Sequence, residues 1–203
     1  MAGIRQTTLI LGEGITEFFF LNSLRDDYPE LKNVKPDYPK HTSLEELEQE
    51  IRKAVRDYNR VFCIIDMDNK KEGGDLQKYL ELKTRYHNKT FKDERQGTDC
   101  NVRFFETDRC TELFFLYYFT YTTKKYLSYK SLVEDLHNYC AYDKTNKFFK
   151  KHPLHPYFKK NGGSLDTAIK NALKSQKYKK DTDADVSFSE IGEMFEELLK
   201  GGK

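Results

Sequence analysis

Long hydrophobic runs are missing from this 203-residue sequence, and several other signatures are missing with them. No apolar stretch approaches the roughly 18 residues of a membrane-spanning helix, and the N-terminus lacks the apolar segment of a secretory signal. The four cysteines show neither CxxC spacing nor a disulfide-rich pattern. No phosphate-binding P-loop is present, so any ATP dependence must come from a partner. We therefore expect a cytoplasmic protein that has no membrane segment.

A strong net charge is also missing. Charged residues make up 33% of the chain, but the formal net charge is only +2, which gives no general nucleic-acid signature. The sign is uneven, because lysines gather between Lys144 and Lys180, where acidic residues are few. This stretch indicates either a surface that faces a polyanion or an ordinary solvated surface. The length suits one sizeable domain with a helical appendage.

The most informative stretch is a short apolar run that ends in two carboxylates. The five residues from Val61 to Ile65 lead directly into Asp66, and Asp68 follows after one residue. Such a run is typical of a strand buried on both faces of a parallel sheet. Ligands bind beyond the carboxyl ends of such strands. Two carboxylates this close repel each other unless a cation separates them, and oxygen ligands favour Mg²⁺ or Mn²⁺.

The N-terminal part of the chain predicts the opening of a βαβ unit. A strand is expected over 7–12, followed by a turn at Glu13 and Gly14. Thr16 is expected to cap a helix that carries Glu17 in its first turn. The acidic residues suggest a cation held between carboxylates, although Glu17 could simply complement the helix dipole.

The remaining elements follow from periodicity and capping patterns. A short strand is expected near Val34, and a fourth strand at 101–106 after a polar loop over 89–100. A helix that begins at Thr107–Glu112 is apolar all round, so Glu112 would enter a buried place and need a metal or a basic partner. Other helices are expected at 44–55, 75–86, 131–138, 165–175 and 188–199. The loop that holds His152 and His155 lacks the further partners of a zinc site.

Parallel strands with right-handed crossovers place all their carboxyl ends at one edge of the sheet. That edge would collect Glu13, Asp66 and Asp68, and Glu17 and Glu112 could join it from helix N-termini. Such a concentration of negative charge requires divalent cations, and two-metal phosphodiester chemistry requires such a cluster.

At these positions the sequence resembles a known family. The segments Leu9–Gly14 and Ile65–Asp68 are similar to the Toprim signature of topoisomerases, primases and OLD-type nucleases. More narrowly, Glu13–Phe20 resembles the Glu-Gly-x-Thr-Glu opening of RloB-like proteins, and Cys110–Phe119 is similar to a later motif of that family. The resemblance implies a Toprim, Rossmann-like α/β core over 1–125 and a lysine-rich helical part over 126–203.

The resemblance also implies an activity: a Mg²⁺- or Mn²⁺-dependent nuclease of DNA or RNA in prokaryotic anti-phage defence. An ATPase of the AAA or ABC type would be its partner. By analogy, Asp66 and Asp68 hold the metal, Glu13 is a ligand or a general acid/base, and Glu17 and Glu112 complete the cluster. Lys159 and Lys160 match a basic stretch of the family and are therefore further candidates for holding phosphate.

Two other interpretations stay open. A non-catalytic Toprim-like module could bind nucleic acid or an ATPase partner. A phosphohydrolase of the haloacid-dehalogenase type could use Asp66 as a nucleophile, although that family expects its motif near the N-terminus and a Thr or Val where this chain has Lys70. The choice between DNA, tRNA and other RNA, the activation trigger and the oligomeric state do not follow from the sequence.

Overall fold

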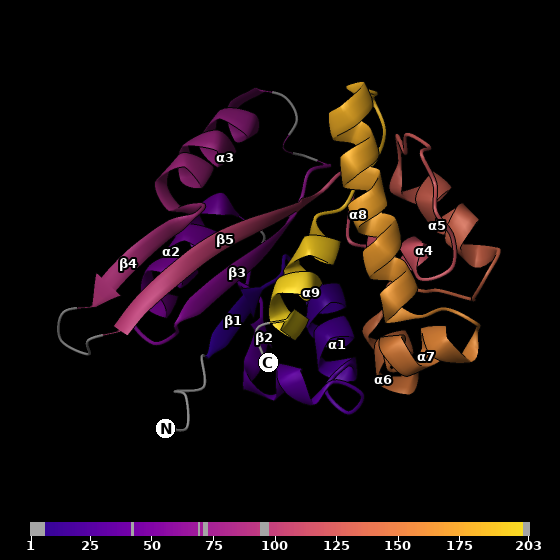
Figure 1. The fold of residues 1–203 in the computed structure, drawn as a ribbon, viewed down its shortest axis with the longest axis horizontal. Coiled ribbons are helices and arrows are strands. Elements are labelled where there is room, and N and C mark those ends of the chain that lie inside the picture. Colours follow the sequence, from indigo (N-terminus) through magenta and orange to yellow (C-terminus); the bar gives the residue numbers. More distant parts are fainter. Residues whose placement is uncertain (1–6, 42, 69, 71–72, 94–97, 201–203) are drawn as a thin grey trace.

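A five-stranded sheet forms the centre of the computed structural model, and helices cover both of its faces (Figure 1). The structure describes residues 7–41, 43–68, 70, 73–93 and 98–200. The strand order is β2-β1-β3-β5-β4, and only the β4–β5 pair is antiparallel. The expected α/β fold with a mostly parallel sheet is confirmed. The strands are β1 (Thr8–Leu11), β2 (Val34–Asp37), β3 (Arg60–Asp66), β4 (Lys89–Asp93) and β5 (Thr98–Thr107).

The helices form two layers on the sheet and a further group beside it (Figure 1). Two helices cover one face, α2 (Leu44–Ala54) and α3 (Gly73–Tyr86), and α1 (Ile15–Ser23) and α9 (Ile191–Lys200) cover the other. None of the helices in the described ranges is long and apolar enough to cross a membrane. The remaining helices, with one 3₁₀ turn, are η1 (Pro29–Asn33), α4 (Glu112–Tyr117), α5 (Tyr129–His137), α6 (Asn146–Lys151), α7 (Leu154–Lys160) and α8 (Leu165–Thr182).

The apolar run of β3 separates two hydrophobic cores. Phe62 and Ile64 point into the core under α1, α4 and α9, while the alternate residues Val61, Cys63 and Ile65 point into the core under α2 and α3. A strand buried on both faces needs a continuous apolar sequence, which explains the pattern seen in the sequence. Asp66 ends this strand at the edge of both cores.

The buried helix expected after β5 is confirmed. All six residues of α4 are buried, from Glu112 to Tyr117. Its aromatic side chains pack against α1 and α9: Phe115 lies 5.0 Å from Phe20 between ring centroids, and Phe114 stacks on Phe195 at 5.6 Å. This packing fixes the start of α4, and with it Glu112, against the end of β3.

The expected polar loop over 89–100 is partly wrong. Residues 89–93 form β4, which pairs with β5 through Lys89 opposite Val102 and Phe91 opposite Cys100. This edge strand has a single large apolar side chain, Phe91, packed on the core, so it lacks the apolar run that marks a buried strand. Residues 94–97 of that loop lie outside the described residues.

Two short helices replace the loop expected around His152 and His155. Thr145 caps α6 by accepting a hydrogen bond from Phe148 N at 3.2 Å, and α7 follows directly. Each helix buries one phenylalanine, Phe149 or Phe158. Helices of six and seven residues are too short to show a clear helical period in the sequence.

The expected cap at Thr16 is also wrong. The helix α1 begins at Ile15 after Gly14, and Thr16 lies inside it. The Glu17 carboxylate folds back instead and accepts a hydrogen bond from Gly14 N at 2.9 Å. A Cβ atom on Gly12 would lie 2.4 Å from Glu17 Cβ, so this close approach requires glycine.

The C-terminal segment completes the free edge of β5. Beyond Val102 the strand has no further pairing with β4. Two of its backbone amides donate to side chains instead. Phe104 N donates to His87 Nδ1, after α3, at 3.0 Å, and Glu106 N donates to Glu190 Oε2, in the C-terminal segment, at 2.8 Å. An edge strand covered in this way cannot pair with another chain there.

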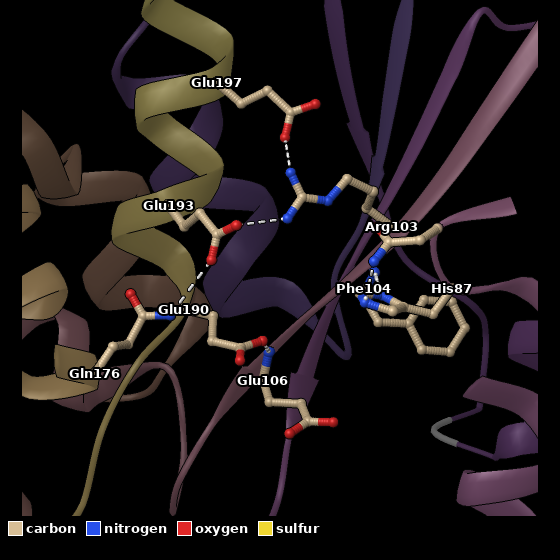
Figure 2. Close-up of polar contacts among 9 residues, drawn as sticks. His87, Arg103, Phe104, Glu106, Gln176, Glu190, Glu193 and Glu197 are labelled. Atoms are coloured by element: carbon tan, nitrogen blue, oxygen red, sulfur yellow. Dashed lines mark hydrogen bonds and ion pairs between the residues drawn. The ribbon is translucent and has the colours of Figure 1, made fainter. Parts of the chain in front are cut away.

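An arginine on β5 fastens α9 to the sheet. Figure 2 shows the guanidinium of Arg103 between two carboxylates of α9, with Nη1 paired to Glu197 and Nη2 2.6 Å from Glu193 Oε1. The guanidinium also lies over the Phe105 ring, 4.8 Å from its centroid. These contacts tie the end of the chain to the strand that leads into the turn before Glu112.

We predict that Arg103→Met lowers the free energy of unfolding by about 1–2 kcal/mol, because it removes partly buried charge-assisted hydrogen bonds but keeps the apolar stem. Urea unfolding followed by circular dichroism measures this loss. Arg52→Met is the control, since it removes an exposed pair with Glu48 on α2 and should cost less than about 0.5 kcal/mol. Equal losses in the two variants would contradict the assigned role of Arg103.

Candidate functional site

The carboxyl ends of β1 and β3 meet at one edge of the sheet, as the topology predicts. Glu13 follows β1, and its Oε1 accepts a hydrogen bond from the backbone N of Asp66 at 3.1 Å. Lys70 lies on the same oxygen, with its Nζ 2.7 Å from Glu13 Oε1, and also donates to the backbone carbonyl of Asp66 at 2.9 Å. The bond between Asp66 N and Glu13 joins residues that are 53 positions apart in the chain.

Two further carboxyl groups reach this edge from the first turns of helices. Glu17, on α1, is buried and lies close enough to Asp66 for its charge to raise the pKa of Asp66. Thr111, just before α4, donates from its hydroxyl to Asp66 Oδ1 at 3.2 Å. Glu112 follows and is 0% exposed. The structure therefore brings Glu13, Glu17, Asp66 and Glu112 together.

Asp68 lies at the margin of this group. Its side chain is half-buried, and its charge raises the pKa of Glu13, which places the two carboxylates near each other. Asn69, the next residue, lies outside the described residues. Asp68 is thus on the Glu13 side of the cluster.

The partners of Glu112 come from the C-terminal half of the chain. Glu112 Oε1 accepts a hydrogen bond from the Tyr142 hydroxyl at 2.8 Å and lies 3.2 Å from Lys144 Nζ. Its second oxygen, Oε2, is buried without a hydrogen-bond partner. Lys144 is the basic partner that a buried Glu112 was expected to need. Neither Tyr142 nor Lys144 was predicted from the sequence to contact Glu112, because nothing in a loop 30 residues away marks it as close to Glu112.

Burial and mutual repulsion control the ionisation of the cluster. Burial raises the pKa of Glu17 to about 7, and the charge of Glu112 adds to the rise. Burial also raises the pKa of Asp66 well above its usual range, with further rises from Glu17, Glu13 and Glu112. Glu13 behaves in the same way, although Lys70 opposes the rise of its pKa. Ionising all of these groups is therefore costly unless a cation joins them.

Lys144 supplies part of that positive charge. Burial alone would lower the pKa of Lys144, but the carboxylates of Glu112, Glu17 and Asp66 outweigh burial and raise it. Lys144 therefore stays protonated beside the cluster. Its ammonium group also lies 5.4 Å from the centroid of the Tyr129 ring.

The carboxylate oxygens of the cluster are suitable ligands for a hard divalent cation, but the described side chains do not converge on one position. All the candidate ligands are carboxylate oxygens, and Glu112 Oε2 lacks a partner, as expected of a group that awaits a cation. Within the part of the chain that the structure describes, however, no three His, Cys, Asp or Glu side chains are arranged to hold a metal. Lys70 and Lys144 occupy the neighbouring positions instead.

A pocket of about 270 Å³ lies beside Glu13 and Lys70. Its other walls come from the first turn of α2 and from α3, through Ser43, Leu44, Glu45, Asp75 and Lys78. The pocket leads from the solvent to the Glu13 side of the cluster. It provides space for a ligand on that side.

The two lysines expected to hold phosphate lie elsewhere. Lys159 pairs with Asp27, with its Nζ 2.5 Å from Asp27 Oδ2, and Asp27 also lies 3.1 Å from His155 Nε2. Asp27 follows the C-terminal end of α1, whereas Glu17 lies in its first turn, and nine helical residues span about 13 Å. Lys160 is exposed on the same helix as Lys159. Their role in phosphate binding stays a prediction.

Comparison with known families gives a match over most of the chain. The family described as "RloB-like protein" matches residues 8–198, which is nearly the whole chain. The chain belongs to the RloB-like family. The resemblance noted at Glu13–Phe20 and Cys110–Phe119 is therefore confirmed at the level of the family. Comparisons of this RloB-like protein with curated proteins and with solved structures give no match.

We predict that Glu17→Gln stabilises the metal-free protein at pH 8. Folding raises the pKa of Glu17 from about 4.5 to about 7, so the folded protein loses stability as the pH rises between these two values. Glutamine mimics the neutral form of the carboxyl group and avoids this loss. The gain should be about 2 kcal/mol at pH 8 and well under half of that at pH 5.

Urea unfolding in EDTA at the two pH values measures this difference. Glu81→Gln, an exposed change on α3, is the control and should have little effect at either pH. A gain of the same size at pH 5 and pH 8 would contradict the raised pKa of Glu17.

Proposed function

We propose that this RloB-like protein is a metal-dependent endonuclease that hydrolyses phosphodiester bonds in DNA or RNA. The observation that carries the proposal is the meeting of buried and half-buried carboxyl groups at one sheet edge. Glu13, Glu17 and Asp66 all have raised pKa values there, and Glu112 keeps an unpartnered oxygen beside them. Ionisable groups with strongly shifted pKa values cluster at functional sites, because holding them buried together costs stability. The resemblance to the Toprim signature supports the same activity.

Each residue has a proposed role. Glu13, Glu17, Asp66 and Asp68 would hold Mg²⁺ or Mn²⁺, which supplies activation of water and stabilisation of the leaving oxygen. Glu13 serves as a ligand or as a general acid/base. Glu112 completes the catalytic cluster.

Several neighbours position these groups. The hydroxyl of Thr111 orients Asp66 through its bond to Oδ1, and Tyr142 and Lys144 hold Glu112 in place. Lys70 fixes Glu13 against the end of β3. Metal binding would draw the carboxylates together and loosen the contacts of both lysines. Until a metal binds, the ammonium groups of Lys70 and Lys144 would supply positive charge beside the carboxylates.

The family resemblance extends the proposal beyond the site. We assign this protein a role in prokaryotic anti-phage defence in the cytoplasm, together with an ATPase of the AAA or ABC type. The chain lacks a P-loop, so ATP would act through that partner.

The alternative is a non-catalytic module that binds nucleic acid or the ATPase. Two observations favour it: Lys70 and Lys144 already neutralise two of the carboxylates, and the described side chains do not converge on a metal position. A module of this kind would need no cation for stability at neutral pH. The two functions differ in whether cleavage depends on Asp66.

We predict that Asp66→Ala and Glu13→Ala each lower cleavage by about 100-fold or more, because each removes a carboxylate that would hold the metal cation at the reacting phosphate. The assay incubates the purified protein, alone and with the AAA- or ABC-type ATPase proposed as its partner, with plasmid and with tRNA in Mg²⁺ or Mn²⁺. The exposed Asp57→Ala, which follows α2, is the matched control and should cleave like the parent protein. Cleavage that survives unchanged in Asp66→Ala would rule out this site as the nuclease centre.

A further inference from the structure

The positive charge of the chain is concentrated in one layer of helices. Residues 144–180 hold eleven lysines and one acidic residue, Asp166, so this segment carries +10. The whole chain carries only +2, so the remaining residues carry −8. All eleven lysines are exposed. The segment comprises α6, α7 and most of α8, which lie on the side of the molecule away from β4 (Figure 1).

Exposed aromatic side chains accompany these lysines. Among the described residues, six large apolar side chains are exposed, and four of them lie between positions 127 and 178. These four are Leu127 (76% exposed), Tyr129 (38%), Tyr139 (40%) and Tyr178 (39%). Tyr139 stacks on Phe119, with ring centroids 5.1 Å apart and planes inclined at 13°, so it presents a supported ring to the solvent.

The same layer reaches the acidic cluster. Lys144 is the first lysine of the basic segment, and it contacts both Glu112 and the Tyr129 ring. The Tyr129 hydroxyl has a raised pKa, owing first to burial and then to the charge of Glu112, which places it beside the cluster. Arg109, in the turn before Thr111, donates from Nη2 to the backbone carbonyl of Leu127 at 2.7 Å. The exposed Leu127 and Tyr129 are therefore held next to the candidate active site.

Lysines interleaved with exposed aromatic rings can bind both the phosphates and the bases of a nucleic acid. Lysines neutralise phosphates regardless of sequence, whereas rings stack only on bases that are free of a duplex. A duplex offers its phosphates but not the faces of its bases. The charge of the layer is also opposite to that of a nucleic acid and of the acidic remainder of the chain.

We propose that α6, α7 and α8, together with Tyr129 and Tyr139, bind single-stranded nucleic acid and lead it to the acidic cluster at Lys144. The inference rests on the proposed nuclease function and names its substrate class. The α6 lysines Lys147, Lys150 and Lys151 are the nearest in sequence to Lys144 and hold the phosphates. Lys159 contributes less, because it pairs with Asp27.

The test measures binding without cleavage. Fluorescence anisotropy with a labelled 20-nucleotide single strand, and with the matching duplex, is recorded in EDTA at several salt concentrations. We expect the triple variant Lys147→Gln, Lys150→Gln and Lys151→Gln to bind the single strand about 10-fold more weakly, with a salt dependence lower by about 2 in log–log slope. The matched triple variant Lys32→Gln, Lys40→Gln and Lys92→Gln, exposed lysines elsewhere, should change binding less than about 2-fold.

The role of the rings is tested in the same assay. Tyr129→Ser should weaken binding of the single strand about 10-fold and of the duplex less than about 2-fold. Tyr38→Ser is the control, because Tyr38 is equally exposed (37%) but lies outside the basic layer. Unchanged binding in the α6 variant, or a duplex bound as tightly as the single strand, overturns the proposal.

The outcome is separable from that of the nuclease proposal. Asp66→Ala should bind the single strand at least as well as the parent protein, since it adds no negative charge and leaves every lysine of the basic segment in place. If all binding results hold and the parent protein never cleaves, the nuclease proposal fails while the binding surface stands. If the parent protein cleaves but the α6 variant binds and cleaves normally, the binding surface fails alone.

Discussion

The repulsion between buried carboxylates at the ends of β1 and β3 is the constraint on which the rest of the structure depends. Burial makes Glu13, Glu17 and Asp66 costly to ionise, and each sits within reach of another's charge. The protein offsets this cost with Lys70 on one side and Lys144 on the other. A cluster that costs stability in this way is the compromise expected if the site serves the proposed nuclease activity.

The position of the cluster could be predicted from the sequence because it follows from β3. The apolar run from Val61 to Ile65 can be satisfied only between two cores, and that requirement fixes Asp66 at the carboxyl edge of a parallel sheet. Once β1 lies beside β3, Glu13 must lie near Asp66. The burial of Glu112 followed in the same way from the uninterrupted apolar sequence of α4.

The partners of the cluster could not be predicted, because they depend on long-range packing. Lys144 and Tyr142 reach Glu112 only after α4 and α5 have packed together, and no local pattern marks either residue. The edge strand β4 was not predicted for a different reason, since its residues 89–93 are largely polar and have no apolar run. Threonine is a favoured N-cap residue, which is why the sequence predicted a cap at Thr16, but the backbone N of Gly14 donates to Glu17 instead.

The most direct test of the account is a crystal of the protein soaked in Mn²⁺ and measured at the manganese absorption edge. If the cluster binds a divalent cation, an anomalous peak lies within about 2.0–2.4 Å of oxygens from Glu13 and Asp66, and Lys70 is displaced from Glu13. A crystal with no peak at this edge of the sheet, in which Lys70 and Lys144 still pair with Glu13 and Glu112, would contradict it.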